Sequence, residues 1–220
     1  MSEIAKTVVG SWSDAMAELD ATLQARRIHP SRAVVLVPYA QLMQQAKLAW
    51  AAHVEAAGNA SAFVPRFETT MNWATGLNVN QLSVAASPED IRMDAALDAL
   101  TATSLLKRAG LGGQHHMLSA RLVEAAWSLA RLAAAQPPSD RLAWAALKSQ
   151  QLGAGMESPA LAFELAIARI ALAWAAASSY PSDVLFDAKT DSAKADLLVV
   201  LKGFQAEPLT EALKIGRAHV

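Results

Sequence analysis

The chain has 220 residues, of which 53% are hydrophobic and 18% charged, and its 19 lysines and arginines nearly balance its 20 aspartates and glutamates. The hydrophobic fraction is too high for a disordered tail, and the length allows one large domain or two small ones. The absence of cysteine excludes disulfide frameworks, thiolate zinc sites, iron–sulfur clusters and cysteine nucleophiles. A net charge of −1 provides no overall basic field, so contact with nucleic acid requires a local patch or other domains.

The N-terminal segment lacks both the basic and the apolar region of a signal peptide. Residues 159–177 could imitate a membrane span, but Glu164 and Arg169 interrupt this stretch and alanine provides much of its apolar character. We therefore expect a buried helix there, no export signal, no membrane partner and a cytoplasmic location.

Two short apolar runs near the front of the chain, at 7–9 and 33–37, are typical of strands covered on both faces of a parallel sheet. An amphipathic helix is predicted after each run. The first helix should be capped by Ser11 or Ser13, whose hydroxyl can accept a free N–H of the first turn.

The second predicted helix should stop at residues 57–59, because Gly58 tolerates a left-handed exit. Residues 63–65 predict a short third strand, which Pro65 confines to an edge or an end of the sheet. A final apolar run at 197–201 predicts a strand that returns to the sheet.

From Ser87 onward the pattern changes to almost continuous helix. The segment from Ser87 to Asp90 is a helix start signal, so a helix is predicted from there to about Ala109. Three further helices are predicted at residues 118–135, 139–152 and 159–177, the second of them capped by Ser139 or Asp140.

These elements predict an α/β fold, with a small parallel sheet interrupted by a large helical insertion. The α/β portion should span residues 1–86, the insertion 87–180, and the return to the α/β layer 181–214.

A phosphate-binding loop would be expected where the first strand turns into a helix. The segment from Val8 to Asp14 has one glycine and no lysine, so it cannot grip a triphosphate in the usual way. The last strand leads into Lys202 and Gly203, where an acidic pair would be needed to hold magnesium. We expect no cofactor in this chain.

Other candidate groups favour structural roles. His115 and His116 lack a suitably spaced carboxylate, which favours a loop or capping role over a metal site. Asp94 and Asp98 share one side of a helix, and we interpret them as solvated surface rather than a catalytic pair. Trp73, in a loop-like stretch, could stack a nucleic-acid base or anchor the loop.

The segment 33–73 contains a strand ending in VLVP, a helix of the xxAxxLxxA kind and a short strand with the step Pro65-Arg66. In that order these pieces resemble the N-terminal region of AddB-type proteins, to which RLVEAAWSLARL and DLLVVLKGFQAEPLTEAL are also similar. The resemblance thus covers most of the chain. These proteins are the inactivated superfamily I helicase subunits of bacterial ATP-dependent helicase-nucleases that process DNA double-strand breaks.

The resemblance implies a P-loop-helicase-like sheet that does not hydrolyse ATP, contacts single-stranded DNA and works with a partner helicase-nuclease subunit. The turn after the second strand resembles helicase motif Ia, which makes Pro38, Tyr39 and Gln41, together with Arg66, the implied nucleic-acid-binding residues. Ala40 and Gln41 stand where arginines are frequent in active relatives, so we expect weak binding of phosphates. The family's PD-(D/E)XK nuclease centre belongs to a C-terminal domain, and its motif does not occur here.

Residues 215–220, IGRAHV, read like a translated sequencing adapter, so we expect a non-native tail and a native sequence that stops near Lys214. The leading hypothesis is a catalytically silent fragment of a DNA-repair subunit whose full-length form belongs to an ATP-dependent exonuclease. An alanine-rich helical protein-interaction module unrelated to DNA is the alternative. A small-molecule enzyme is disfavoured, because no convergent set of catalytic residues is evident.

Overall fold

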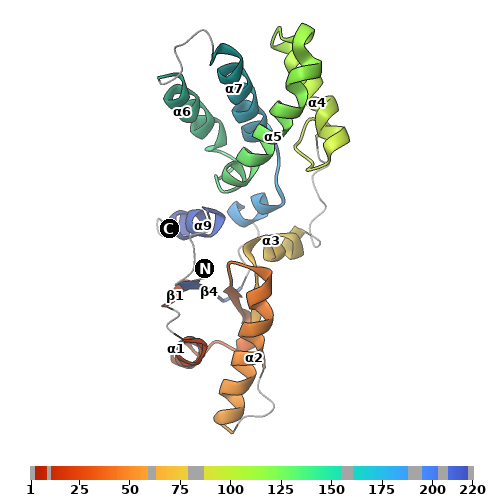
Figure 1. Cartoon of the computed structure of the whole chain (residues 1–220). Coiled ribbons are helices and arrows are strands. Elements are labelled where there is room, and N and C mark those ends of the chain that lie inside the picture. The colour runs from red at the N-terminus through yellow and green to blue at the C-terminus, as the bar shows by residue number, and fades with distance from the viewer. Residues whose placement is uncertain are drawn as a thin grey trace. The chain divides into compact units, whose positions relative to one another are not determined.

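The computed structural model describes residues 3–8, 11–58, 63–78, 87–154, 161–187, 195–202 and 208–217. The fold is α/β, as predicted: most described residues are helical, and the strands form a small parallel sheet. The chain divides into two compact units (Figure 1). We call residues 1–82 and 184–220 the α/β unit and residues 83–183 the helical unit.

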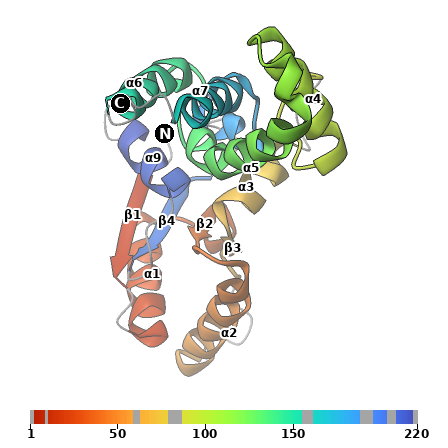
Figure 2. The same ribbon diagram turned by 45° about the horizontal axis from the view of Figure 1, so that its top comes forward.

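Four parallel strands make the sheet, in the order β1-β4-β2-β3 (Figure 2). They are β1 (Glu3–Val8), β2 (Ala33–Leu36), β3 (Arg66–Glu68) and β4 (Leu197–Lys202). The predicted return strand is therefore confirmed. It pairs with β1 on one side and β2 on the other, so a segment from the end of the chain lies between two from its beginning.

The central position of β4 explains its uninterrupted apolar sequence. Leu197 and Leu198 point to opposite faces and are both fully buried, which requires cover on both sides of the sheet. On one face, the core contains side chains of the sheet and of helices α1 (Trp12–Arg26) and α2 (Ala40–Ala56). Its fully buried members include Met16, Leu19, Val35 and Leu197.

Helix α1 begins and ends where local chemistry places its boundaries. Ser11 is the N-cap, since its Oγ accepts the N–H of Asp14 at 3.1 Å, which decides between the two predicted serines. Arg27 takes a left-handed conformation at φ 54° after the last turn, and the Ile28 N–H donates to the Leu23 carbonyl at 2.9 Å. Gly58, at φ 77°, follows α2 in the same way, as predicted.

Two strand predictions need correction. The third strand is not at 63–65 but begins at Arg66, because Pro65 has no N–H for the ladder and Phe63 is 62% exposed. The first strand is not confined to 7–9: β1 runs from Glu3 to Val8. Val9, with Gly10 of the loop tested for phosphate binding, lies outside the described residues.

Two further helices of the α/β unit lie among the described residues. Helix α3 (Thr70–Asn78) follows β3 directly, and α9 (Pro208–Arg217) follows β4. Helix α9 includes the first three residues of the segment that we expect to be a non-native tail.

Within the described residues, the helical unit contains four main helices, as predicted, and the short 3-10 turn η2 (Gly112–Gln114), and the 3-10 helix η4 (Pro181–Phe186) begins at its end. The four main helices are α4 (Ala95–Arg108), α5 (His115–Ala134), α6 (Arg141–Gly153) and α7 (Ala162–Ala177). Buried alanines such as Ala126 and Ala171 alternate with larger side chains such as Leu122 and Trp174 in the core. No helix in the described ranges is both long and apolar enough to cross a bilayer.

The predicted start of the first insertion helix at Ser87 is wrong. Residues 87–90 form a turn, in which the Asp90 N–H donates to the Ser87 carbonyl at 3.0 Å and the Ser87 N–H donates to Asp90 Oδ2 at 2.8 Å. Short polar side chains that bond their own backbone compete with helix in this way. Helix α4 begins at Ala95, with Asp94 as its N-cap.

The predicted side-chain cap of α6 is also wrong. Asp140 occupies the N-cap position but makes no capping hydrogen bond; its Oδ1 accepts the Ser139 hydroxyl at 2.8 Å instead.

An exposed ion pair joins the start of β2 to the start of β4. The Arg32 guanidinium donates two hydrogen bonds to the Asp196 carboxylate, at 2.9 and 2.8 Å. This bidentate contact holds the pKa of Asp196 below its ordinary value and raises that of Arg32.

An NMR pH titration of the Asp196 carboxyl group is expected to give a pKa below the ordinary aspartate value, and Arg32→Met should raise it again. Because the folded-state pKa is lowered, the stabilisation is present above the unfolded-state pKa and disappears as the pH falls through the folded-state pKa. An Asp196 pKa that does not change in Arg32→Met would show that the guanidinium is not its cause.

Candidate nucleic-acid interface

The turn that follows β2 lies at the carboxyl edge of the sheet. The Val37 N–H donates to the Glu68 carbonyl at 2.9 Å, which extends the β2–β3 pairing up to the turn. Pro38 is half-buried, Tyr39 is 45% exposed and Gln41 is exposed. Three of the four implied DNA-binding residues are therefore brought together on one accessible turn.

Helix α2 starts in this turn without a side-chain cap. Tyr39 occupies the N-cap position in an extended conformation, and no side-chain hydrogen bond satisfies the first N–H groups. Such groups, at the positive end of the helix dipole, can donate to an anionic oxygen.

Arg66 does not join this turn. Arg66, at the start of β3, pairs with Val34 of β2. Val34 precedes Pro38 by four residues, which corresponds to about 13 Å along the strand. Its guanidinium instead lies 4.0 Å from the Glu68 carboxylate on its own strand. The sequence order placed Arg66 after a Pro step but could not give its register against β2.

Glu68 also lies near the turn, although no sequence pattern indicated it. It ends β3, its carbonyl bonds Val37, and its side chain is 25% exposed. A carboxylate one strand away from the turn repels phosphate, and this adds to the absence of arginine at Ala40 and Gln41.

Helices α3 and α9 approach each other in the α/β unit through two buried threonines. Thr70 Oγ1 and Thr210 Oγ1 lie 2.7 Å apart, and both residues are buried. The Thr69 hydroxyl accepts the Asn72 N–H at 3.1 Å at the start of α3, and Asn72 Nδ2 lies 3.7 Å from Met43 Sδ of α2. These contacts fix α3 next to the first turns of α2.

Trp73 is not in a loop, as expected from the sequence, but inside α3. It is fully buried, so its ring cannot stack on a base in this conformation. Among the residues that the structure describes, no acceptor lies within hydrogen-bond distance of its Nε1, although this atom is shielded from solvent. Tyr39, which is exposed, is therefore the candidate for base stacking at this turn.

Trp73→Phe is expected to destabilise the protein less than Trp50→Phe, by about 1 kcal/mol. Both tryptophans are buried, but Trp50 Nε1 donates to the Phe63 carbonyl at 3.1 Å, whereas the Trp73 donor is unsatisfied. Urea unfolding followed by circular dichroism measures both variants, and an equal loss in the two would contradict this difference.

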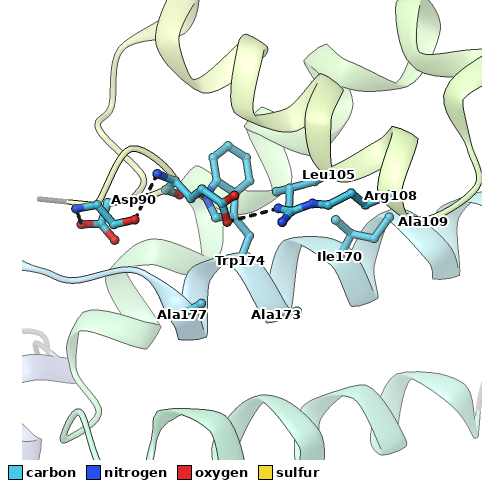
Figure 3. Close-up of a pocket in the computed structure, with 10 residues that line it drawn as sticks. Asp90, Leu105, Arg108, Ala109, Ile170, Ala173, Trp174 and Ala177 are labelled. Carbon is cyan, nitrogen blue, oxygen red and sulfur yellow. Dashed lines mark hydrogen bonds and ion pairs between the residues drawn. The ribbon is translucent and has the colours of Figure 1, made fainter.

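A pocket of about 470 Å³ lies within the helical unit (Figure 3). Its walls are mainly apolar and come from the turn at 87–90, the end of α4, and α7. Across it Arg108 Nη2 lies 3.2 Å from Glu89 Oε2, and both side chains are more than half exposed.

The other polar groups of this pocket are already occupied. The carboxylate of Asp90 accepts the N–H groups of Ser87 and Ser179, and Trp174 Nε1 donates to the Glu89 carbonyl at 2.6 Å. The lining presents no nucleophile beside a base, so we assign no reaction to the pocket.

The interpretation as solvated surface is wrong for Asp98, whereas Asp94 is exposed, as expected. Asp94 caps α4 by accepting the N–H groups of Ala96 and Leu97 at 2.9 and 3.0 Å. Asp98 is fully buried and accepts Trp127 Nε1 at 2.7 Å and the Arg92 N–H at 3.0 Å. Both carboxylates satisfy donors of the fold.

The histidine pair lies at the start of α5. His115 Nδ1 is 2.6 Å from the Gly112 carbonyl, and the two imidazole rings of His115 and His116 are 3.8 Å apart. The contact of His115 with the Gly112 carbonyl fits the loop or capping role that the sequence predicted. Within the ranges that the structure describes, no three histidine or carboxylate side chains are grouped to hold a metal ion.

Comparison with known proteins found no matching family model, no matching curated protein and no matching solved structure. The resemblance to AddB-type proteins is therefore one of sequence motifs alone.

Proposed function

We propose that this chain is a catalytically silent, P-loop-helicase-like part of a subunit that repairs DNA double-strand breaks, and that it serves as a DNA-handling scaffold beside a partner helicase-nuclease subunit. The observation that carries the proposal is the position of the Pro38–Gln41 turn. It follows a central strand of a parallel sheet, at the edge where α/β proteins bind ligands, and it leads into an uncapped helix.

The chemistry of the turn favours weak contact with single-stranded DNA. It has no charged side chain, so phosphates would be held by backbone N–H groups and the Gln41 amide. The half-exposed ring of Tyr39 is available to stack on one base. With so few phosphate contacts, the affinity should fall only shallowly with salt.

Tyr39→Ala is expected to weaken binding of a labelled single-stranded oligonucleotide by about 5-fold to 100-fold in a fluorescence anisotropy titration at low salt, because one base loses its stacking partner. Gln41→Ala should weaken binding by a smaller factor. Gln44→Ala is the matched control, since Gln44 is an exposed glutamine of the same helix, three residues farther from the turn.

If Tyr39→Ala and Gln44→Ala bind as the unmodified chain does, the turn is not the DNA contact. If the unmodified chain binds no DNA even at low salt, the proposed function is wrong.

We expect the chain to hydrolyse neither ATP nor DNA. The segment that would hold the triphosphate has one glycine and no lysine, and the nuclease motif is missing from the sequence. A phosphate-release assay and a nuclease assay with magnesium check this, and appreciable turnover in either would refute the silent assignment.

A protein-interaction module unrelated to DNA is the second candidate, and exposed apolar side chains of the helical unit favour it. Met93, two residues before α4, is 58% exposed, and Leu97 and Leu100 on α4 are 46% and 70% exposed. Met117 on α5 is 72% exposed. Apolar surface of this kind is typical of docking faces. Absence of DNA binding in the titration above would favour this candidate.

A further inference from the structure

Within the helical unit, the segment that enters it and the segment that leaves it are hydrogen-bonded to each other. The Ile91 N–H donates to Ser178 Oγ at 3.1 Å, and the Ser179 N–H donates to Asp90 Oδ1 at 3.1 Å. The indole of Trp174 adds its bond to the Glu89 carbonyl. We call these three contacts the clasp.

Burial makes the clasp energetically important. Asp90 and Ser178 are 5% and 2% exposed, so a broken bond would leave polar groups without water. Ser178 Oγ also donates to the Trp174 carbonyl at 2.9 Å, so this hydroxyl satisfies a donor of one end and an acceptor of the other.

A second set of bonds anchors the departing segment to the middle of the unit. Arg141, at the start of α6, is 3% exposed and donates to the carbonyls of Ser178 and Ala133. It also pairs with Asp183 and lies over the Tyr180 ring. The entering and departing segments of the helical unit and the helices α5, α6 and α7 are thereby joined through one buried network.

We propose that the clasp closes residues 83–183 into an autonomous folding unit, which opens as a whole and independently of the α/β unit. An autonomous domain of this kind has its own hydrophobic core, and its two ends lie close together. The core of α4, α5 and α7 meets the first condition, and the joined ends meet the second.

Hydrogen exchange of the full chain, measured by mass spectrometry, tests this proposal with Ser178→Ala. The variant leaves the Ile91 N–H buried without an acceptor, so exchange should accelerate about 10-fold or more throughout the helical unit, in the core of α4, α5 and α7 as well as in residues 87–94. Exchange in β2 and β4 should not change.

Ser128→Ala is the matched control. Ser128 Oγ makes the same bond to the carbonyl four residues earlier, on Glu124, but it is exposed and, among the described residues, bonds no second segment. Asp90→Asn, which keeps the shape of the side chain, is the second variant if Ser178→Ala folds poorly, and the same pattern is expected.

Two results would overturn the proposal. Equal acceleration of exchange in Ser178→Ala and Ser128→Ala would show that the clasp does not stabilise the helical unit. Acceleration of β2 and β4 together with the helical unit would show that the chain opens as one body rather than as two.

Discussion

Arg141→Met is expected to lower the free energy of unfolding of the helical unit by about 3–5 kcal/mol. Methionine roughly keeps the length and the apolar stem of the side chain but removes every donor. The carbonyls of Ala133 and Ser178 and the Asp183 carboxylate then lose their buried partner. Breaking one side of such a network is costly because the remaining groups stay shielded from water.

The measurement is chemical denaturation of the full chain, followed by circular dichroism. Lys148→Met on the same helix is the control, since Lys148 is exposed and bonds only Gln151 among the contacts described. A loss below about 1 kcal/mol in Arg141→Met, or an equal loss in the two variants, would show that the buried network does not stabilise the unit.

Asp98→Ala is expected to cost about 2–4 kcal/mol, more than Asp94→Ala on the same helix, for which about 1 kcal/mol is typical. Asp98 is fully buried and satisfies both the indole N–H of Trp127 and the backbone N–H of Arg92. Alanine leaves these two donors without an acceptor. Asp94 is an exposed N-cap, whose lost bonds water can replace.

Parallel urea titrations of the two variants measure the difference. If Asp94→Ala is as destabilising as Asp98→Ala, burial of the second carboxylate is not what makes it important.

The fold was predictable where a single local pattern decides the structure. The apolar runs of β2 and β4 indicated strands covered on both faces, and a glycine after α2 indicated its end. The turn at 87–90 was mispredicted because the same short polar side chains that start helices also close turns.

The candidate interface was predictable only in part. Pro38, Tyr39 and Gln41 are contiguous, so one turn holds them together wherever it lies. Arg66 and Glu68 depend on the register of β3 against β2, which no local pattern specifies. Asp98 was misread for a similar reason, since its partner Trp127 is on another helix.

The central claim, that the turn after β2 contacts single-stranded DNA, is tested most directly by hydrogen exchange of the full chain with and without excess oligonucleotide at low salt. We expect slower exchange of the amides from Tyr39 to Met43, and unchanged exchange in α6. Unchanged exchange in the turn under conditions where the chain binds the oligonucleotide would contradict it.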